Sequence, residues 1–323
     1  MILLWGLQDD GPLAAVRREL ERSGAEVLFI DQRRTPQHHL ALEANCGRFG
    51  GSLSHPGGAT KLEQIHAVYP RPYDITTLDG LEILDERPDM LAIAAEFERR
   101  MLAWLDHTPA VVVNRPSAMT SNASKPFQLE LIRAAGWLVP PTLVTTSASD
   151  AHDWWDRHQR CIYKSISSQR SIVSELSPDH RLRLDDVAWC PTQFQKRIDG
   201  VDYRVHVIDD CVYATRITSS GDDYRYDTST HLDWIQLPED VSRRCIELAR
   251  SLELRFAGID LRRTPADDWY CFEVNPSPGF TYFADATGQP IAEQLATILC
   301  DQDGGQRAIH REEAAPARGM LDR

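Results

Sequence analysis

The chain has 323 residues and a formal net charge of -13, with 26% charged and 42% hydrophobic residues. This length can bury a sizeable core and is enough for two or three compact units, because domains commonly contain about 100 to 200 residues. The negative charge argues against general nucleic-acid binding, since phosphate backbones are held mainly by Lys and Arg, and no apolar run approaches the roughly 18 residues of a membrane span.

The first third of the chain predicts a parallel sheet with helices on its faces, because short apolar runs alternate with amphipathic segments. The opening run has neither the basic start nor the long apolar stretch of a signal peptide, which predicts a cytoplasmic protein. Residues 33–66 have little periodicity and several glycines, and are predicted to form long loops or an irregular insert. Strands are predicted at 2–7, 27–30, 67–69 and 110–113, and helices at 12–23 and 90–105.

The pattern restarts after Asn114-Arg115-Pro116, which predicts a domain boundary near residues 115–120. Beyond it, hairpins such as the one turning at Asp209-Asp210 predict a mixed sheet. The segment after Cys300 is polar and non-periodic and is predicted to be a mobile tail. Strands are predicted at 142–146, 161–166, 193–198, 203–208, 212–218, 256–261 and 269–274, and helices at 124–135, 238–252 and 291–299.

The segment 257–279 carries the most informative polar residues. In an antiparallel pair of strands, Asp260 and Glu273 can point to the same face, and Asn275 stays on that face because side chains alternate. Two carboxylates and an amide oxygen form a hard oxygen cluster of the kind that holds Mg²⁺ together with nucleotide phosphates. The alternative is a solvated strand face, although acidic residues flanked by apolar ones are costly unless their charge is offset.

This segment resembles the metal-binding end of the ATP-grasp ligases, especially the branch with glutathione synthetase and the ribosomal-protein glutamate ligase. The shared pattern is a strand Asp, then Glu-x-Asn, then a short Ser/Pro/Gly turn, here Asp260, Glu273-Val274-Asn275 and Ser277-Pro278-Gly279. The resemblance covers residues 110–300 and, more weakly, the sheet before them. It implies an α/β fold (α+β ATP-grasp), with an amino-terminal Rossmann-like pre-ATP-grasp domain at 1–116, two α+β subdomains at 117–190 and 191–302 that sandwich ATP, and a mobile tail at 303–323.

The resemblance also implies which residues hold the nucleotide. Two lysines are expected, one before the first helix of the ATP-grasp region and one on a strand that can neutralise the triphosphate as a point charge. Either lysine by itself is more often a solvated surface charge. Residues 195–198 resemble the hinge that reads the adenine edge, with an ordinary amphipathic strand as the alternative, and Asp202 is the candidate for the ribose hydroxyls. The nucleotide-binding candidates are therefore Lys125, Lys164, Gln195, Lys196, Arg197, Ile198 and Asp202.

Two arginines are the catalytic candidates. Arg204 and Arg216 lie on the two strands of the hairpin that follows the hinge, at positions where both can face one ligand. In the family such arginines contact the γ-phosphate and the developing acyl phosphate, where a planar cation stabilises the transferring charge. The alternative is that both are surface arginines.

One segment departs from the family pattern. Many relatives carry a Gly-rich loop over the phosphates after the strand lysine, whereas residues 165–171 here contain no glycine. Ser hydroxyls, backbone amides and Arg170 can still cover an anion. The absence makes the chain similar to graspetide synthetases, which form ω-ester and ω-amide crosslinks in ribosomal peptides. Residues 221–226 are only an approximate counterpart of their Asp-x-Arg stretch.

The resemblance implies an ATP-dependent carboxylate-amine or carboxylate-hydroxyl ligase that works through an acyl phosphate, with ATP and two Mg²⁺ ions as cofactors. The expected substrate is an amino acid or an acidic side chain of a ribosomal peptide. Two alternatives stay open, a small-molecule ligase that makes a dipeptide or polyglutamate-type product and a non-catalytic ATP-regulated binding protein. The intact Asp, Glu and Asn set argues against the second alternative. No nucleic-acid or membrane partner is expected, and assembly into a homo-oligomer is left open.

Overall fold

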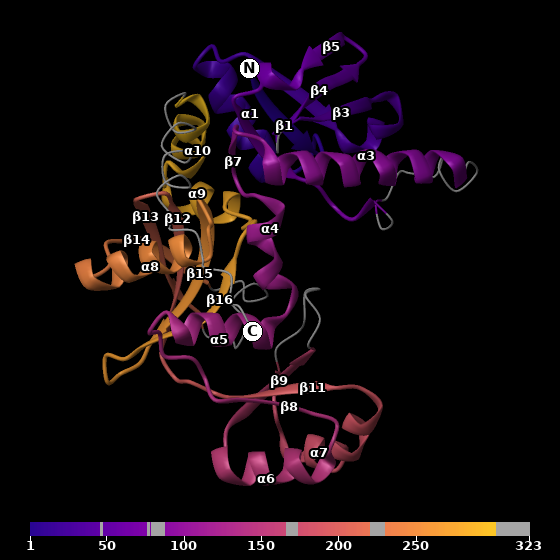
Figure 1. The fold of residues 1–323 in the computed structure, drawn as a ribbon. Helices are drawn as coiled ribbons and strands as arrows, with labels where there is room; N and C mark the ends of the chain where they lie inside the picture. The colour runs from indigo at the N-terminus through magenta and orange to yellow at the C-terminus, as the bar shows by residue number, and fades with distance from the viewer. Residues whose placement is uncertain (46–47, 76–77, 79–87, 166–173, 220–229, 302–323) are drawn as a thin grey trace, which may run out of the picture. The chain divides into compact units, whose positions relative to one another are not determined.

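The computed structural model describes residues 1–45, 48–75, 78, 88–165, 174–219 and 230–301. The chain divides into two compact units, one from Met1–Pro116 with Ala292–Arg323 and the other from Ser117–Ile291 (Figure 1). No described helix is both long and apolar enough to cross a membrane. The expected mobile tail at 303–323 lies outside the described residues, and the expected bounds of the ATP-grasp subdomains stay predictions.

The first unit is built on a four-stranded parallel sheet of order β2-β1-β6-β7, which confirms the predicted parallel sheet. Strand β1 is an unbroken run of buried side chains, as expected where both faces of a parallel sheet are covered. Helix α1 begins where the Asp10 carboxylate accepts a hydrogen bond from the backbone N–H of Leu13 at 2.8 Å. The elements are β1 (Ile2–Gly6), α1 (Gly11–Arg22), β2 (Val27–Asp31), β6 (Ala67–Arg71), α3 (Pro88–His107), β7 (Val111–Val112) and, from Ala292 onward, α10 (Ile291–Cys300).

The prediction of long loops or an irregular insert at residues 33–66 is wrong, because this segment forms a three-stranded antiparallel sheet of order β3-β4-β5. Glycine and polar residues weaken the apolar alternation that signals a strand. A Cβ at Gly51, where φ is +133°, would lie 2.0 Å from the carbonyl oxygen of Ala41, so only glycine allows this pairing. The elements are η1 (Gln32–Gln37), β3 (His39–Asn45), β4 (Arg48–His55), β5 (Gly58–Lys61) and η2 (Leu62–Gln64).

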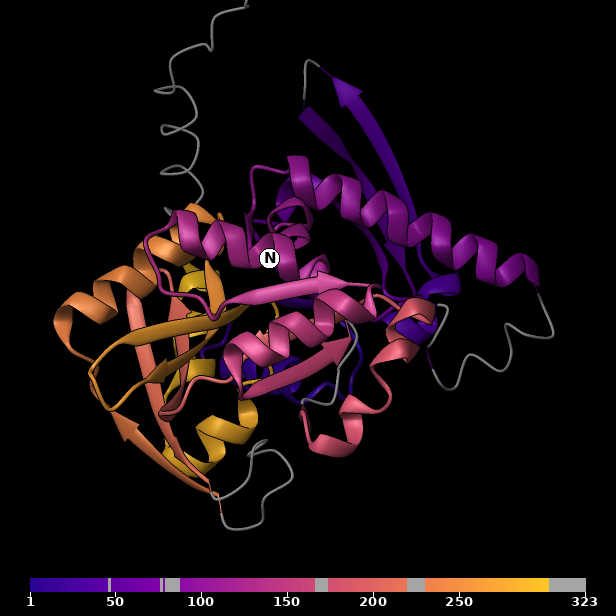
Figure 2. The same ribbon diagram turned by 90° about the horizontal axis from the view of Figure 1, so that it is seen from below.

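The second unit contains a small antiparallel sheet of order β10-β9-β11-β8. One face packs on helix α6 (Figure 2). Phe194 of this sheet and Trp155 of α6 share a core with Leu184. Side-chain alternation places Lys164, Gln193 and Gln195 on the opposite face, which we call the Lys164 face. The elements are β8 (Thr142–Thr145), α6 (Ala148–His158), β9 (Cys161–Ser165), β10 (Ser174–Glu175), α7 (Pro178–Arg181), η5 (Leu184–Trp189) and β11 (Thr192–Lys196).

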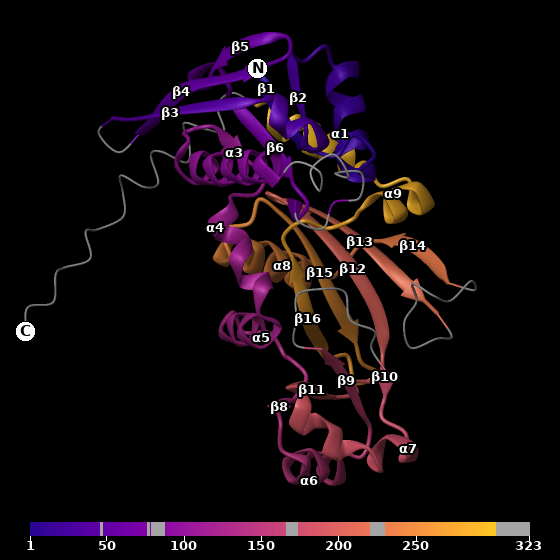
Figure 3. The ribbon, with the colours of Figure 1, turned by 90° about the vertical axis from the view of Figure 1, so that its right-hand side faces the viewer.

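A five-stranded antiparallel sheet of order β14-β13-β12-β15-β16 forms the rest of the second unit (Figure 3). Helices α5 and α8 cover one face, and their apolar side chains share a buried core with Val205, Ile259 and Val274. The predicted hairpins and flanking helices are confirmed. The elements are α4 (Pro116–Met119), η4 (Thr120–Ala123), α5 (Lys125–Ala134), β12 (Val201–Ile208), β13 (Cys211–Thr218), β14 (His231–Ile235), α8 (Glu239–Ser251), β15 (Phe256–Arg263), β16 (Trp269–Asn275) and α9 (Thr281–Thr287).

Helix α8 stabilises the large sheet through one apolar stripe, because Val241, Cys245, Leu248 and Ala249 recur at helical spacing and are all buried. We expect Leu248→Ala to lower the free energy of unfolding of the second unit by about 2 to 5 kcal/mol, since it removes buried methyl groups and leaves a cavity. Urea denaturation followed by circular dichroism measures this loss. Glu247→Ala, on the exposed side of the same helix turn, is the control and is expected to change stability little. Equal unfolding midpoints for the two variants would contradict the packing described.

Candidate active site

The face of the large sheet opposite α5 and α8 carries a row of three charged residues, which we call the carboxylate row. Strand register places Arg204 opposite Asp260, and Asp260 opposite Glu273. Arg204 Nε lies 3.1 Å from Asp260 Oδ1, and the arginine side chain is only 8% exposed. The predicted antiparallel pairing of Asp260 with Glu273 is therefore confirmed. Their role as metal ligands stays a prediction.

Asn275 lies in the next row of the same face, opposite Gly258. Its Oδ1 accepts a hydrogen bond from the backbone N–H of Ser277 at 2.9 Å, which begins the turn after β16. A register shift follows the Asp260–Glu273 pair, so that Leu261 pairs with Cys271 and β16 carries one extra residue, Phe272. The shift comes after the Asp260–Glu273 pair, and the alternation from Glu273 to Asn275 is kept.

Gln128 of α5 fixes β16 between these two candidate ligands. Its amide Nε2 donates to the carbonyl of Val274 at 2.7 Å, and its Oε1 accepts from the N–H of Val274 at 3.0 Å. The buried side chain thus pairs with β16 as a neighbouring strand would, which holds Glu273 and Asn275 at fixed positions.

Lys164 lies close enough to Lys125, Glu273 and Asp260 for their charges to act on it. Burial and the nearby charge of Lys125 lower the pKa of Lys164 to about 8, while the carboxylates of Glu273 and Asp260 oppose the shift. The structure therefore brings together four residues that the sequence places on three strands and a helix. Lys164 Nζ also lies 3.5 Å from Gln195 Oε1.

The hinge candidates have different surroundings. Gln195 is fully buried and donates to the hydroxyl of Thr142 at 3.0 Å, whereas Lys196 is exposed. Arg197 pairs with the carboxylates of Glu175 and Asp199, which turns its guanidinium toward the small sheet. The buried Ile198 offers its backbone carbonyl, which accepts a hydrogen bond from Arg262 at 2.7 Å. Of the four hinge candidates, Gln195 is the one whose side chain lies on the Lys164 face next to Lys164.

Asp202 lies on β12 directly opposite Arg262. Its two oxygens accept from Arg262 Nε at 2.6 Å and Nη2 at 2.7 Å. This contact orients the carboxylate on the same face of the sheet as Arg204, because the two residues are two positions apart on one strand.

The sheet does not turn Arg204 and Arg216 toward one ligand. Arg204 is opposite Thr215, whereas Arg216 is opposite Tyr203, and neighbouring positions of a strand alternate between faces. Arg216 instead pairs with Asp233 of β14 at 2.7 Å and is about half exposed. The expectation that both arginines face one site is corrected by this register, and Arg204 is the arginine that the carboxylate row contains.

Sequence patterns missed two buried polar residues on these faces. Gln193 is opposite Lys164 on the Lys164 face and is fully buried, and within the described part of the chain its amide has no hydrogen-bond partner. His206, two residues after Arg204, is fully buried between Phe256 and Phe283, and burial lowers its pKa well below the usual value. His206 is a single polar residue in an apolar run, and Gln193 alternates with Phe194 as in an ordinary amphipathic strand. Neither pattern separates a ligand contact from a core position.

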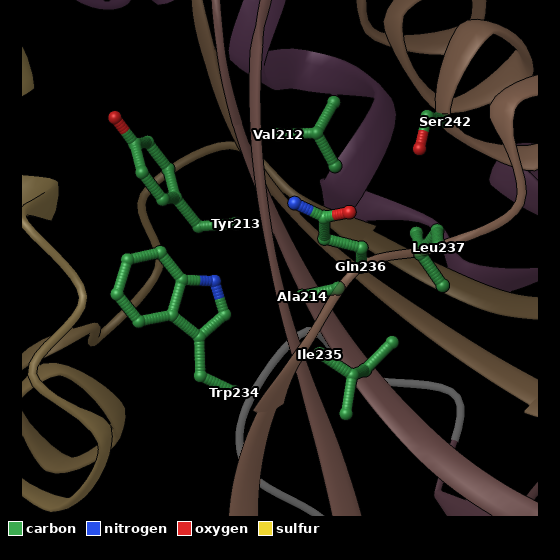
Figure 4. Close-up of a pocket in the computed structure, with 8 residues that line it drawn as sticks. All are labelled: Val212, Tyr213, Ala214, Trp234, Ile235, Gln236, Leu237 and Ser242. Atoms are coloured by element: carbon green, nitrogen blue, oxygen red, sulfur yellow. The ribbon is translucent and has the colours of Figure 1, made fainter.

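A cavity of about 250 Å³ lies elsewhere on this sheet, at the β13–β14 edge (Figure 4). In Figure 4, Tyr213 and Trp234 project to one side of the strands, and Leu237 and Ser242 lie on the other. The eight residues that line the cavity include none of the predicted site residues. The cavity is therefore separate from the carboxylate row.

The close packing at Gly258 yields a prediction. A Cβ there would lie 2.6 Å from Pro278 Cβ and 2.9 Å from Arg204 Nη1. We expect Gly258→Ala to displace the turn or the arginine and to lower the free energy of unfolding by about 1 to 3 kcal/mol. Gly279→Ala is the matched control, because a Cβ at Gly279 meets no atom within 4 Å. Urea denaturation of both variants tests the packing, which is wrong if both unfold at the wild-type midpoint.

Comparisons with known proteins agree on one family. Residues 187–299 match the RimK-like ATP-grasp domain. The structure of the ATP-grasp ligase PsnB complexed with a phosphomimetic variant of minimal precursor, Mg and ADP has a TM-score of 0.78 to this chain at 26% identity, and the match covers 93% of this chain and 98% of that chain.

Two further relatives are more distant. A RiPP-associated ATP-grasp ligase of Chryseobacterium gregarium, in complex with ADP and a leader and core peptide, has the same fold at a TM-score of 0.77 and 23% identity, covering 93% of this chain and 96% of that one. Tetrahydromethanopterin:alpha-L-glutamate ligase of Methanocaldococcus jannaschii is 22% identical over 218 residues, which cover 62% of this chain and 73% of the relative. The RimK-like match spans the strands that carry Arg204, Asp260 and Glu273. Residues 187–299 of the chain therefore form a RimK-like ATP-grasp domain, and the chain has the fold of the ATP-grasp ligases.

Proposed function

We propose that this ligase activates a carboxylate on an acidic side chain of a peptide and joins it to an amine or a hydroxyl. The carboxylate row is the observation that carries the proposal, because it combines a buried cation with two acidic side chains on one face of the sheet. PsnB, the relative at 26% identity, was solved with minimal precursor, Mg and ADP, and also with a precursor peptide and AMPPNP, which supports a peptide substrate. The proposal includes a cytoplasmic location and two Mg²⁺ ions.

The residues of the site fit Mg²⁺. Asp260, Glu273 and Asn275 provide two carboxylates and an amide oxygen, which are hard oxygen ligands. Among the described residues, no three His, Cys, Asp or Glu side chains are grouped closely enough to hold a metal by themselves. This agrees with Mg²⁺, which is commonly held by one or two carboxylates together with nucleotide phosphates. When bound, Mg²⁺ would neutralise charge on the phosphates.

The chain's own cations would position and neutralise the triphosphate. Burial and the nearby charge of Lys125 lower the pKa of Lys164, and a bound anion would favour the protonated form of this lysine. Arg204 presents a planar guanidinium at the centre of the carboxylate row, where it can stabilise a transferring phosphoryl group. Catalysis is then mainly positioning and electrostatics, and no protein nucleophile is needed.

The reaction has two transfers. An oxygen of the substrate carboxylate attacks the γ-phosphorus of ATP, the bond to the β,γ-bridging oxygen breaks, and ADP leaves. The amine or hydroxyl then attacks the acyl carbon, phosphate leaves with the carboxylate oxygen, and the nucleophile loses a proton. Each ligation therefore consumes one ATP and releases ADP and phosphate.

A small-molecule product is the second candidate. The relative from M. jannaschii is named as a glutamate ligase, and N-acetylaspartylglutamate synthase A of Mus musculus is 22% identical over 335 residues, which cover 96% of this chain and 81% of the relative. Both names describe joining of an amino acid to a small molecule. An amino-acid substrate would need the same acyl activation, so only the substrate pool separates the two candidates.

Hydroxylamine trapping tests the proposal and separates these candidates. We expect Mg²⁺-dependent ADP release with a pool of acidic peptides, and a peptide hydroxamate when hydroxylamine intercepts the acyl phosphate. A hydroxamate from the amino-acid pool alone would favour the small-molecule ligase. ATP binding without ADP release from either pool would contradict the proposal and favour an ATP-regulated binding protein.

The predicted metal ligands are tested by removing one charge at a time. We expect Asp260→Asn and Glu273→Gln each to lower the rate of ADP release by about 100-fold or more, because each loses a charged oxygen ligand. Asp267→Asn is the matched control, since Asp267 is exposed at the β15–β16 turn and pairs with Arg263. If the control and the two site variants lose activity equally, the assignment of the carboxylate row fails.

Nucleotide affinity is expected to fall as pH rises through about 8. The pKa of Lys164 is lowered to about 8 in the free protein, and a bound triphosphate favours the protonated ammonium. The affinity for ATP should therefore decrease between pH 7 and 10, by at most about tenfold per pH unit. Lys164→Arg keeps a positive charge over this range and should flatten the profile. Calorimetric titrations measure both profiles, and identical slopes would refute the role of Lys164.

A further inference from the structure

Arg262 links the strand of a predicted metal ligand to the predicted hinge. Its Nε and Nη2 donate to the two oxygens of Asp202 at 2.6 and 2.7 Å, and its Nη1 donates to the carbonyl of Ile198 at 2.7 Å. Its guanidinium also lies over the ring of Phe272, 5.3 Å from the centroid. Arg262 follows Asp260 by two residues on β15, so the two side chains share a face. One planar group thus contacts both ends of residues 198–202, the segment that leads into β12.

This arrangement uses the full geometry of a guanidinium. The fork to Asp202 is bidentate, and the remaining amino group, Nη1, donates to the carbonyl of Ile198. A lysine ammonium is a point charge and cannot reproduce the planar bidentate fork. The contact is also shielded, because the Arg262 side chain is 22% exposed. The carboxylate of Asp202 keeps further lone pairs that can accept other hydrogen bonds.

We propose that Arg262 is a positioning residue for the nucleotide, and this inference rests on the proposed function. By holding both oxygens of Asp202, it would aim their free lone pairs at the two ribose hydroxyls. By engaging the Ile198 carbonyl, it fixes the peptide plane at the end of the hinge. Arg262 itself touches neither the reacting phosphate nor the acceptor carboxylate, so its effect is on nucleotide affinity and sugar selection.

Discrimination between ATP and 2′-deoxy-ATP separates this role from a merely structural ion pair. An ion pair that only stabilises the sheet would affect the two nucleotides equally. A carboxylate held for the ribose accepts a charged hydrogen bond from the 2′-hydroxyl, which we expect to make ATP bind about tenfold more tightly than its deoxy analogue. The ratio of the two affinities is therefore the quantity to measure.

The experiment uses calorimetric titration of the full chain with each nucleotide and Mg²⁺. We expect Arg262→Gln to reduce the affinity ratio to about one, and Asp202→Asn to do the same. The double variant should show no further loss, because the two residues act as one unit. Arg262→Lys should restore the ratio only in part. In peptide-dependent turnover, the KM for ATP should rise more than kcat falls.

Arg263→Gln is the matched control, because Arg263 is the next residue, is exposed and pairs with Asp267. It should keep the wild-type ratio. If Arg262→Gln does not fold, Asp202→Asn and Arg262→Lys carry the test. Wild-type ATP binding with an unchanged ratio in these variants would overturn the role of Arg262 and leave the proposed function standing. A wild-type chain that binds no ATP would instead refute the proposed function.

Discussion

The site depends on one buried contact, between the guanidinium of Arg204 and the carboxylate of Asp260. Asp260 faces Glu273 across β15 and β16, and two carboxylates in such a pair repel each other unless a cation offsets their charge. Arg204 supplies that cation from β12, where little water screens it. The row is therefore in register before any ligand arrives, and less rearrangement is needed when one binds.

The rest of the second unit holds the carboxylate row in place through contacts with the strands that carry it. The covered face of the large sheet is apolar and packs on α5 and α8, so the strands cannot slip by one residue without burying charge. The side chain of Gln128 pairs with both the N–H and the carbonyl of Val274. Pro278 packs close to Gly258, next to Arg204. These contacts come from residues far apart in the sequence. Each fixes backbone next to the charged residues rather than a charged group itself.

The segment 257–279 could be predicted from the sequence because its chemistry is local, with strand alternation setting the faces of Asp260, Glu273 and Asn275. Arg216 could not be placed this way, since its face depends on how β12 and β13 register, and that register puts it opposite Tyr203. The sheet at 39–61 could not be predicted from the sequence, because glycines at close strand contacts interrupt the apolar alternation that signals a strand. Arg262 looks like any surface arginine until its partners Asp202 and Ile198 are known.

The candidate site contains more cations than carboxylates, whereas the chain as a whole carries a net charge of -13. Around the carboxylate row, four cations meet three carboxylates, namely Lys125, Lys164, Arg204 and Arg262 with Asp202, Asp260 and Glu273. Burial and the charge of Lys125 lower the pKa of Lys164, while the carboxylates of Glu273 and Asp260 oppose the shift. At the proposed nucleotide site, a bound polyphosphate would offset the repulsion between the protonated lysines. This electrostatic balance would favour binding of an anion to a chain whose overall charge is negative.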